Sequence, residues 1–167
     1  PAVRELIIER LQEMKKERIG RVLQAIRFAQ PRSPEADWKP APAPFWHAHF
    51  GEAAAEAERT GRRLLVLCYH SKIFPAYLAD NAFHEAVGKN YTLLFLDADD
   101  SGMPPSQKQQ LAVVRKSLEI DSVWPSGAVV GPDLNFITAI AGLDDYKEES
   151  LLPRLKNLPG NLPPSQK

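Results

Sequence analysis

Apolar side chains recur at steps of three and four residues through the first thirty positions, with charged residues between them. This spacing predicts one amphipathic helix over residues 2–30 whose apolar side needs a partner surface. Glutamates at every fourth position form a ladder along the same helix, and Gly20 is its weakest helix former. The apolar positions are Leu6, Ile7, Leu11, Met14, Ile19, Val22, Leu23 and Ile26.

Prolines separate this helix from the rest of the chain. Residues 31–46 are proline-rich, and because proline has no amide hydrogen to continue a helix, we expect an extended linker there. Residues 159–167 are proline-rich again and are expected to form a loose tail. The pattern therefore divides the chain into a helix at 1–30, the linker, one compact domain at 47–158, and the tail.

Strand and helix patterns alternate within residues 47–158. Continuous apolar runs at 64–69 and 91–97 are typical of strands buried on both faces. Two shorter strands are expected at 126–130 and 135–140, joined by a hairpin turn at 131–134. Helices are expected over residues 50–60, 75–88, 107–118 and 146–157. A strand–helix–strand unit gives a parallel pair and a hairpin an antiparallel one, so the sequence predicts an α/β fold with a mixed four-stranded sheet flanked by helices.

Three stretches of the domain carry a family resemblance. They are EAAAEAERTGRRLLVLCY (52–69), YTLLFLDAD (91–99) and SLEIDSVWPSGAVVGPDLNFITAIAGL (117–143). Together they resemble the thioredoxin superfamily over residues 50–157, about two-thirds of the chain. The resemblance implies a thioredoxin-like sheet and a cis peptide bond between Trp124 and Pro125 that faces the active-site loop.

The chain departs from the redox-active members of that superfamily. Their CxxC motif sits after the first strand, where this chain has Ile73-Phe74-Pro75-Ala76. Dithiol exchange needs two sulfur atoms close together, and Cys68 is the only cysteine. The domain therefore resembles redox-inactive relatives, among them the UAS-type domains of ubiquitin-regulatory proteins, through Leu64-Leu65-Val66 and His70.

The same resemblance points to a binding groove. It implies that the loop after the first strand faces the cis-proline segment over a helix N-terminus, a place suited to a peptide or an anion. The alternative is an ordinary surface loop in which Pro75 begins a helix. The residues of this candidate groove are His70, Ser71, Lys72, Phe74, Trp124 and Pro125.

Few residues of the sequence are candidates for catalysis or metal binding. Cys68 lies inside an apolar strand, where a thiol packs as a small hydrophobe; the alternative is a thiol-dependent redox enzyme or sensor that uses this one cysteine. His47 and His49 have no further ligand residue beside them. We therefore expect no metal and no cofactor.

Charge and hydropathy limit the partners and the location. The 167 residues contain 21 basic and 21 acidic side chains, so no overall field favours nucleic acid. The visible chain shows neither a membrane span nor the apolar core of a signal peptide. A cytoplasmic location is open, as is a periplasmic or organellar one if a precursor segment was removed.

These observations favour a non-catalytic thioredoxin-like module that binds protein, as an accessory or structural subunit of a larger assembly. The N-terminal helix is the expected docking element, although it can also fold back on its own domain or lie on a membrane surface. Its docking residues are expected to be Leu6, Leu11, Met14, Val22 and Ile26. The alternatives are the single-cysteine redox enzyme or sensor and a chaperone-like or ubiquitin-pathway domain that binds peptides in the groove.

Overall fold

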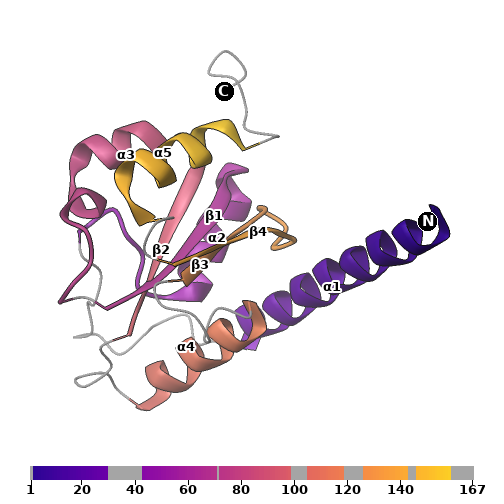
Figure 1. Cartoon of the computed structure of the whole chain (residues 1–167). Helices are drawn as coiled ribbons and strands as arrows, with labels where there is room; N and C mark the ends of the chain where they lie inside the picture. The colour runs from indigo at the N-terminus through magenta and orange to yellow at the C-terminus, as the bar shows by residue number, and fades with distance from the viewer. Residues whose placement is uncertain are drawn as a thin grey trace.

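The structure is a computed structural model that describes residues 2–29, 43–70, 72–98, 105–118, 126–142 and 146–158. Its helices are α1 (Ala2–Ala29), α2 (Phe50–Thr60), α3 (Asn81–Val87), α4 (Pro105–Leu118) and α5 (Glu148–Asn157), with a short 3-10 helix, η1 (Ala76–Ala79). Its strands are β1 (Arg63–Tyr69), β2 (Tyr91–Asp97), β3 (Ser126–Val130) and β4 (Phe136–Ala141). Figure 1 shows their arrangement.

The strands form one mixed sheet in the order β2-β1-β3-β4. β1 pairs in parallel with β2 and antiparallel with β3, and β3 pairs antiparallel with β4. Leu65 lies opposite Leu93 of β2, and Cys68 lies opposite Ser126 at the start of β3. The predicted α/β fold, with a mixed four-stranded sheet flanked by helices, is confirmed.

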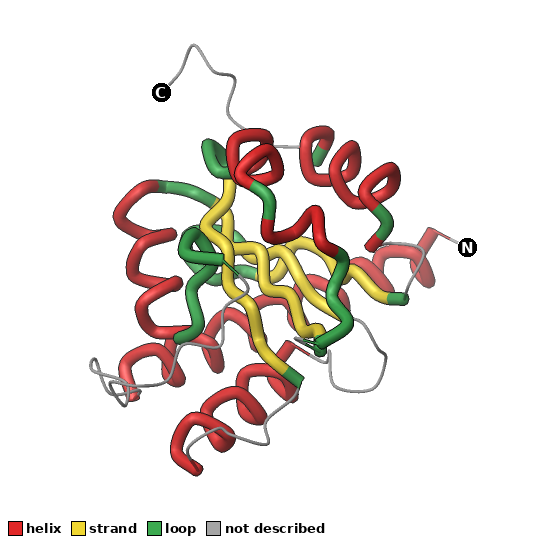
Figure 2. Tube along the Cα trace, turned by 90° about the vertical axis from the view of Figure 1, so that its left-hand side faces the viewer, coloured by secondary structure: helices red, strands yellow, loops and turns green. Residues whose placement is uncertain are grey.

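Two apolar cores lie on opposite faces of the sheet. Figure 2 shows the helices that cover both faces. Successive side chains of a strand point to opposite faces, so β1 places Leu64 and Val66 in one core and Leu65 in the other. The core that we name the α1-side core is covered by α1, α2 and α4. The α5-side core is covered by η1, α3 and α5. This two-sided burial explains why β1 and β2 read as continuous apolar runs.

The single helix expected at 75–88 is wrong, because the chain divides it into η1 and α3. The backbone of Asp80 is extended between them, with ψ 142°. The indole Nε1 of Trp46 donates a hydrogen bond of 2.7 Å to the carbonyl oxygen of Leu78. That oxygen would accept from the amide of residue 82 in a continuous α-helix, so a distant side chain takes the place of a helical bond.

The end of the expected linker belongs to the domain. Trp46 is buried in the α5-side core and stacks on Phe83, with 6.1 Å between the ring centroids. The amide of His47 donates to the carbonyl of Leu93, and its carbonyl accepts from the amide of Phe95. Residue 47 thus adds a short parallel bridge to the outer edge of β2. Residues 30–42 of the chain lie outside the described part.

The C-terminal part of α1 packs against the domain. Ile19 and Leu23 are buried in the α1-side core. Gly20 lies against the turn between β3 and β4, where a β-carbon would stand 2.6 Å from the side-chain oxygen of Asn135. This close approach explains why a poor helix former occupies the position. The segment around Gly20 therefore folds back on its own domain, one of the three outcomes that the sequence left open.

Leu23→Ala is expected to lower the free energy of unfolding by about 3 kcal/mol, because it empties a fully buried site. The matched change Val22→Ala removes a side chain that is 40% exposed and should cost less than about 0.5 kcal/mol. Urea unfolding followed by circular dichroism measures both values. Equal losses from the two variants would contradict the packing of α1 on the domain.

Candidate functional site

The first half of α1 projects from the domain (Figure 1). Every residue from Ala2 to Lys15 is exposed. Glu9 and Glu13 stand two turns before Lys16 and Gly20, and therefore on the side of the helix that packs on the domain further along. Carboxylates cannot be buried against an apolar surface without a large desolvation cost. The glutamate ladder is therefore suited to a segment that stays in solvent.

An apolar stripe runs along the opposite side of α1. Since each helical residue turns by about 100°, five apolar side chains fall within a third of the circumference, on the side away from Gly20 and Leu23. We name this stripe the outer seam: Val3 (69% exposed), Ile7 (55%), Leu11 (59%), Met14 (49%) and Val22 (40%).

The outer seam corrects the expectation of a single apolar face on this helix. Leu11, Met14 and Val22 of the expected docking set lie on the seam, whereas Leu6 is exposed beside the glutamate ladder. The side chain of Ile26 lies outside the described residues. Periodicity alone joined the seam residues to Ile19 and Leu23, although these two groups face opposite ways.

Cations share the half of the helix that carries the outer seam. Helical spacing places them between or beside the seam residues, while the glutamates stand on the other half. The exposed pair between Arg10 Nη1 and Glu17 Oε1, 4.0 Å apart, lies at the border of the two halves and contributes little to stability. The cations of the seam half are Arg4, Arg10, Lys15, Arg18 and Arg21.

The turn between β3 and β4 fixes the direction of α1. Asp133 accepts hydrogen bonds from the backbone and the side-chain amide of Asn135, at 3.0 and 2.6 Å. The side chain of Gln24 donates to the carbonyl oxygen of Asp133 at 3.0 Å. Leu134 has a positive φ of 68° and is fully buried in the α1-side core. The strain of that backbone is sustained because the leucine side chain fills the core next to α1.

The structure describes half of the candidate groove after β1. His70 and Phe74 are partly buried, Lys72 is exposed, and the amide of Lys72 donates to Nδ1 of His70 at 3.2 Å. Phe74 packs edge-on against Phe95, with 6.0 Å between the ring centroids. These residues follow the C-terminal end of β1, which lies beside the start of β3.

Ser71, Trp124 and Pro125, the remaining members of the groove, lie outside the described residues. The facing arrangement that the family resemblance implies therefore stays a prediction.

Cys68 is fully buried in the α1-side core, as its place in an apolar run predicted. An enzyme that used this thiol would need it to reach a substrate and to ionise, and burial among apolar side chains opposes both.

The thiol of Cys68 is expected to react with N-ethylmaleimide about a hundredfold more slowly, or slower still, in the native chain than in urea, because the sheet must open first. Mass spectrometry of timed samples at neutral pH measures both rates. Rapid labelling of the native chain would contradict this burial and favour the single-cysteine enzyme.

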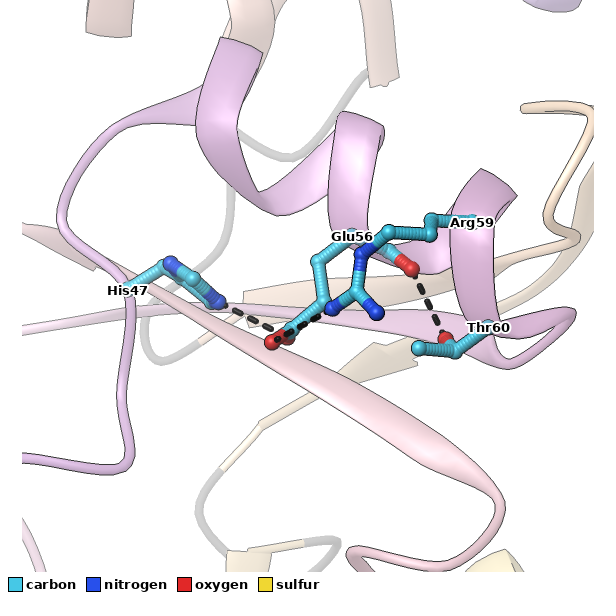
Figure 3. A network of polar contacts seen from close by, with 4 residues as sticks. All are labelled: His47, Glu56, Arg59 and Thr60. Atoms are coloured by element: carbon cyan, nitrogen blue, oxygen red, sulfur yellow. Dashed lines mark hydrogen bonds and ion pairs between the residues drawn. The ribbon is translucent and has the colours of Figure 1, made fainter.

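A polar cluster joins the edge of β2 to α2 (Figure 3). Nε2 of His47 lies 2.9 Å from Oε2 of Glu56, and Nη2 of Arg59 lies 3.8 Å from Oε1 of the same carboxylate. The hydroxyl of Thr60 donates to the backbone carbonyl of Glu56 at 2.7 Å. Partial burial alone would raise the pKa of Glu56, but the hydrogen bond and charge of His47 and the charge of Arg62 lower it below its usual value. The cluster ties the chain before α2 to the domain.

Glu56→Gln is expected to lower the free energy of unfolding near neutral pH by about 1 kcal/mol, a modest value because the pair is partly exposed. Because the folded-state pKa of Glu56 is lowered, the contribution of its carboxylate is present above the unfolded-state pKa and is lost as the pH falls through the folded-state pKa. The ionic part of the contact with His47 also requires a protonated imidazole. Urea unfolding across this pH range measures the difference, with the exposed Glu52→Gln as control. If the wild type kept the same excess in free energy of unfolding over Glu56→Gln at acid pH, the stabilising role of the ionised carboxylate would be contradicted.

No metal centre or membrane span is found in the described ranges. They contain no group of three or more His, Cys, Asp and Glu residues that could hold a metal ion. None of the described helices combines the length and the apolar character needed to cross a bilayer. His47 and His49, the one histidine pair considered from the sequence, precede α2, with His49 at its N-cap.

No family model, curated protein or solved structure matches this chain. The candidate site is therefore defined by the chain's own residues. Sequence reasoning found the helix but missed its division into an inner and an outer side. The sequence does contain a sign of this division. The side of the helix that carries glutamates up to Glu13 becomes apolar by Gly20, where it packs on the domain.

Proposed function

We propose that this chain is a non-catalytic, thioredoxin-like module that binds a protein partner through α1, as an accessory or structural subunit of a larger assembly. The observation that carries the proposal is the outer seam, an apolar stripe left exposed on a helix whose other side is anchored in the core. Burying a side chain such as Leu11 or Met14 is worth about 1.5–3 kcal/mol relative to leaving it exposed. A partner that covered the seam would gain several such contributions.

Anchoring makes the projecting half of α1 a better docking element than a free peptide. A helix of about fourteen residues is marginal on its own in water, because its first turn is costly to form. Here the turns around Ile19 and Leu23 are already fixed by the α1-side core, so the projecting turns continue an existing helix. A preformed helix loses less conformational entropy on binding than a disordered segment does.

The sheet supports the thioredoxin-like part of the proposal. The parallel pair β1–β2 and the antiparallel pair β3–β4 have the directions that the resemblance implies. The alternatives gain less support from the described residues. Burial of Cys68 opposes the single-cysteine enzyme. For the peptide-binding domain, Phe74 packs against Phe95 of its own core rather than standing open as an anchor.

A truncated chain that begins at Lys15 tests the docking role of α1. It removes most of the outer seam but keeps Ile19 and Leu23, so its urea midpoint should stay within error of the full chain. Proteins that co-purify with each form from the native cells are compared by quantitative mass spectrometry. We expect at least one stable partner of the full chain to be lost with the truncation. An unchanged set of partners, on a truncated chain shown to be folded, would reject the docking role.

A further inference from the structure

We infer that the partner surface is an acidic amphipathic helix that lies lengthwise along the outer seam. This inference rests on the proposed docking role of α1 and specifies the chemistry of its partner. It is carried by two features together: the length of the apolar stripe and the sign of the charges beside it.

The shape of the outer seam favours another helix. From Val3 to Val22 the seam extends about 30 Å along the axis, at the 1.5 Å rise of each helical residue. Leu6 and Ile8 are also exposed beside the seam, and together these side chains form a long apolar row of the kind that contacts a second helix, whereas a helix lying on a membrane often includes aromatic rings on its apolar face. Residues 2–25 contain no aromatic side chain.

The charges select an acidic partner. Arg10 and Arg21 border the seam on one side, Arg4 and Lys15 border it on the other, and Arg18 lies within it. In paired helices, side chains at these flanking positions meet their counterparts on the partner and set which partner is accepted. Glutamates flanking an apolar stripe on the partner would therefore oppose a cation at each border.

A second copy of this chain fits the seam poorly. Two outer seams placed face to face would bring the arginines and lysines of both copies together, and like charges at such borders are destabilising. Glu5, Glu9 and Glu13 stand on the other half of each helix and would not meet the cations of a second seam, and Glu17 already pairs with Arg10 of its own helix.

The domain leaves the whole seam accessible to a partner helix. The seam faces away from Gly20 and Leu23, where α1 meets the hairpin turn and the core. Val22 remains 40% exposed although its neighbour Leu23 is fully buried. The exposed part of Val22 therefore remains open to a partner helix beside the anchored half of α1.

Two synthetic helical peptides of about 20 residues test this inference, since that length matches the seam. Both carry the same leucine stripe, which is flanked by glutamates in one peptide and by lysines in the other. Binding of each peptide to the full chain is measured by fluorescence anisotropy. We expect the glutamate peptide to bind about tenfold more tightly or better, with the difference shrinking as salt is raised.

Matched variants locate the contact. Leu11→Asp, on the seam, should weaken the glutamate peptide about tenfold or more, whereas Leu6→Asp, equally exposed but off the seam, should have little effect. Arg10→Glu together with Lys15→Glu should reverse the preference toward the lysine peptide, whereas Lys16→Glu, on the ladder side, should not. All these positions lie outside the core, and unchanged urea midpoints verify folding.

Several outcomes would overturn the inference. These are equal binding of the two peptides, binding of neither, or a preference that survives the double charge reversal. Seam-dependent binding to phosphatidylserine vesicles without peptide preference would identify a membrane surface instead. Concentration-dependent dimerisation lost in Leu11→Asp would identify a second copy. If truncation removes a native partner while the glutamate peptide fails to bind, the docking role stands and only the acidic class is rejected.

Discussion

The contact between α1 and the β3–β4 turn sets the geometry on which the candidate site depends. Leu23 enters the α1-side core while Gly20 allows the turn to approach the helix backbone, and Gln24 donates a hydrogen bond to Asp133 beside them. Apolar burial stabilises this contact, and the hydrogen bond from Gln24 helps to fix the orientation of the helix. Without it, α1 would be a tethered peptide. With it, the outer seam is held at a fixed angle to the sheet.

The opposite face of the sheet is closed by tyrosines that combine apolar rings with satisfied hydroxyls. Tyr91 donates to the carbonyl of Leu155 at 2.7 Å and joins the start of β2 to the last turn of α5. Tyr77 donates to the carbonyl of Tyr146, and the Tyr146 hydroxyl and the Val66 carbonyl leave no room for a side chain at Gly127. Burial, followed by the charge of Glu148, raises the pKa of Tyr77, so this hydroxyl remains a donor at physiological pH.

Much of the fold could be predicted because it depends on local patterns. The continuous apolar runs of β1 and β2 indicated strands covered on both faces, and the two apolar cores provide that cover. The break in the helix expected at 75–88 could not be predicted, since it depends on a bond from Trp46, thirty-two positions before Leu78. The positive φ of Leu134 likewise follows from packing against α1. Periodicity found the apolar residues of α1, but only tertiary contacts reveal which of them face the domain.

Different selective pressures act on the two sides of α1. Changes at Ile19 or Leu23 affect whether the chain folds, whereas changes at Ile7 or Leu11 leave the core untouched. Proteins sit only slightly above the stability that they need, and mutations that alter recognition are often limited by that margin. A helix with its fold-determining residues on one side and its recognition residues on the other escapes this limit. Relatives of this chain could therefore diverge in what they bind while keeping the same scaffold.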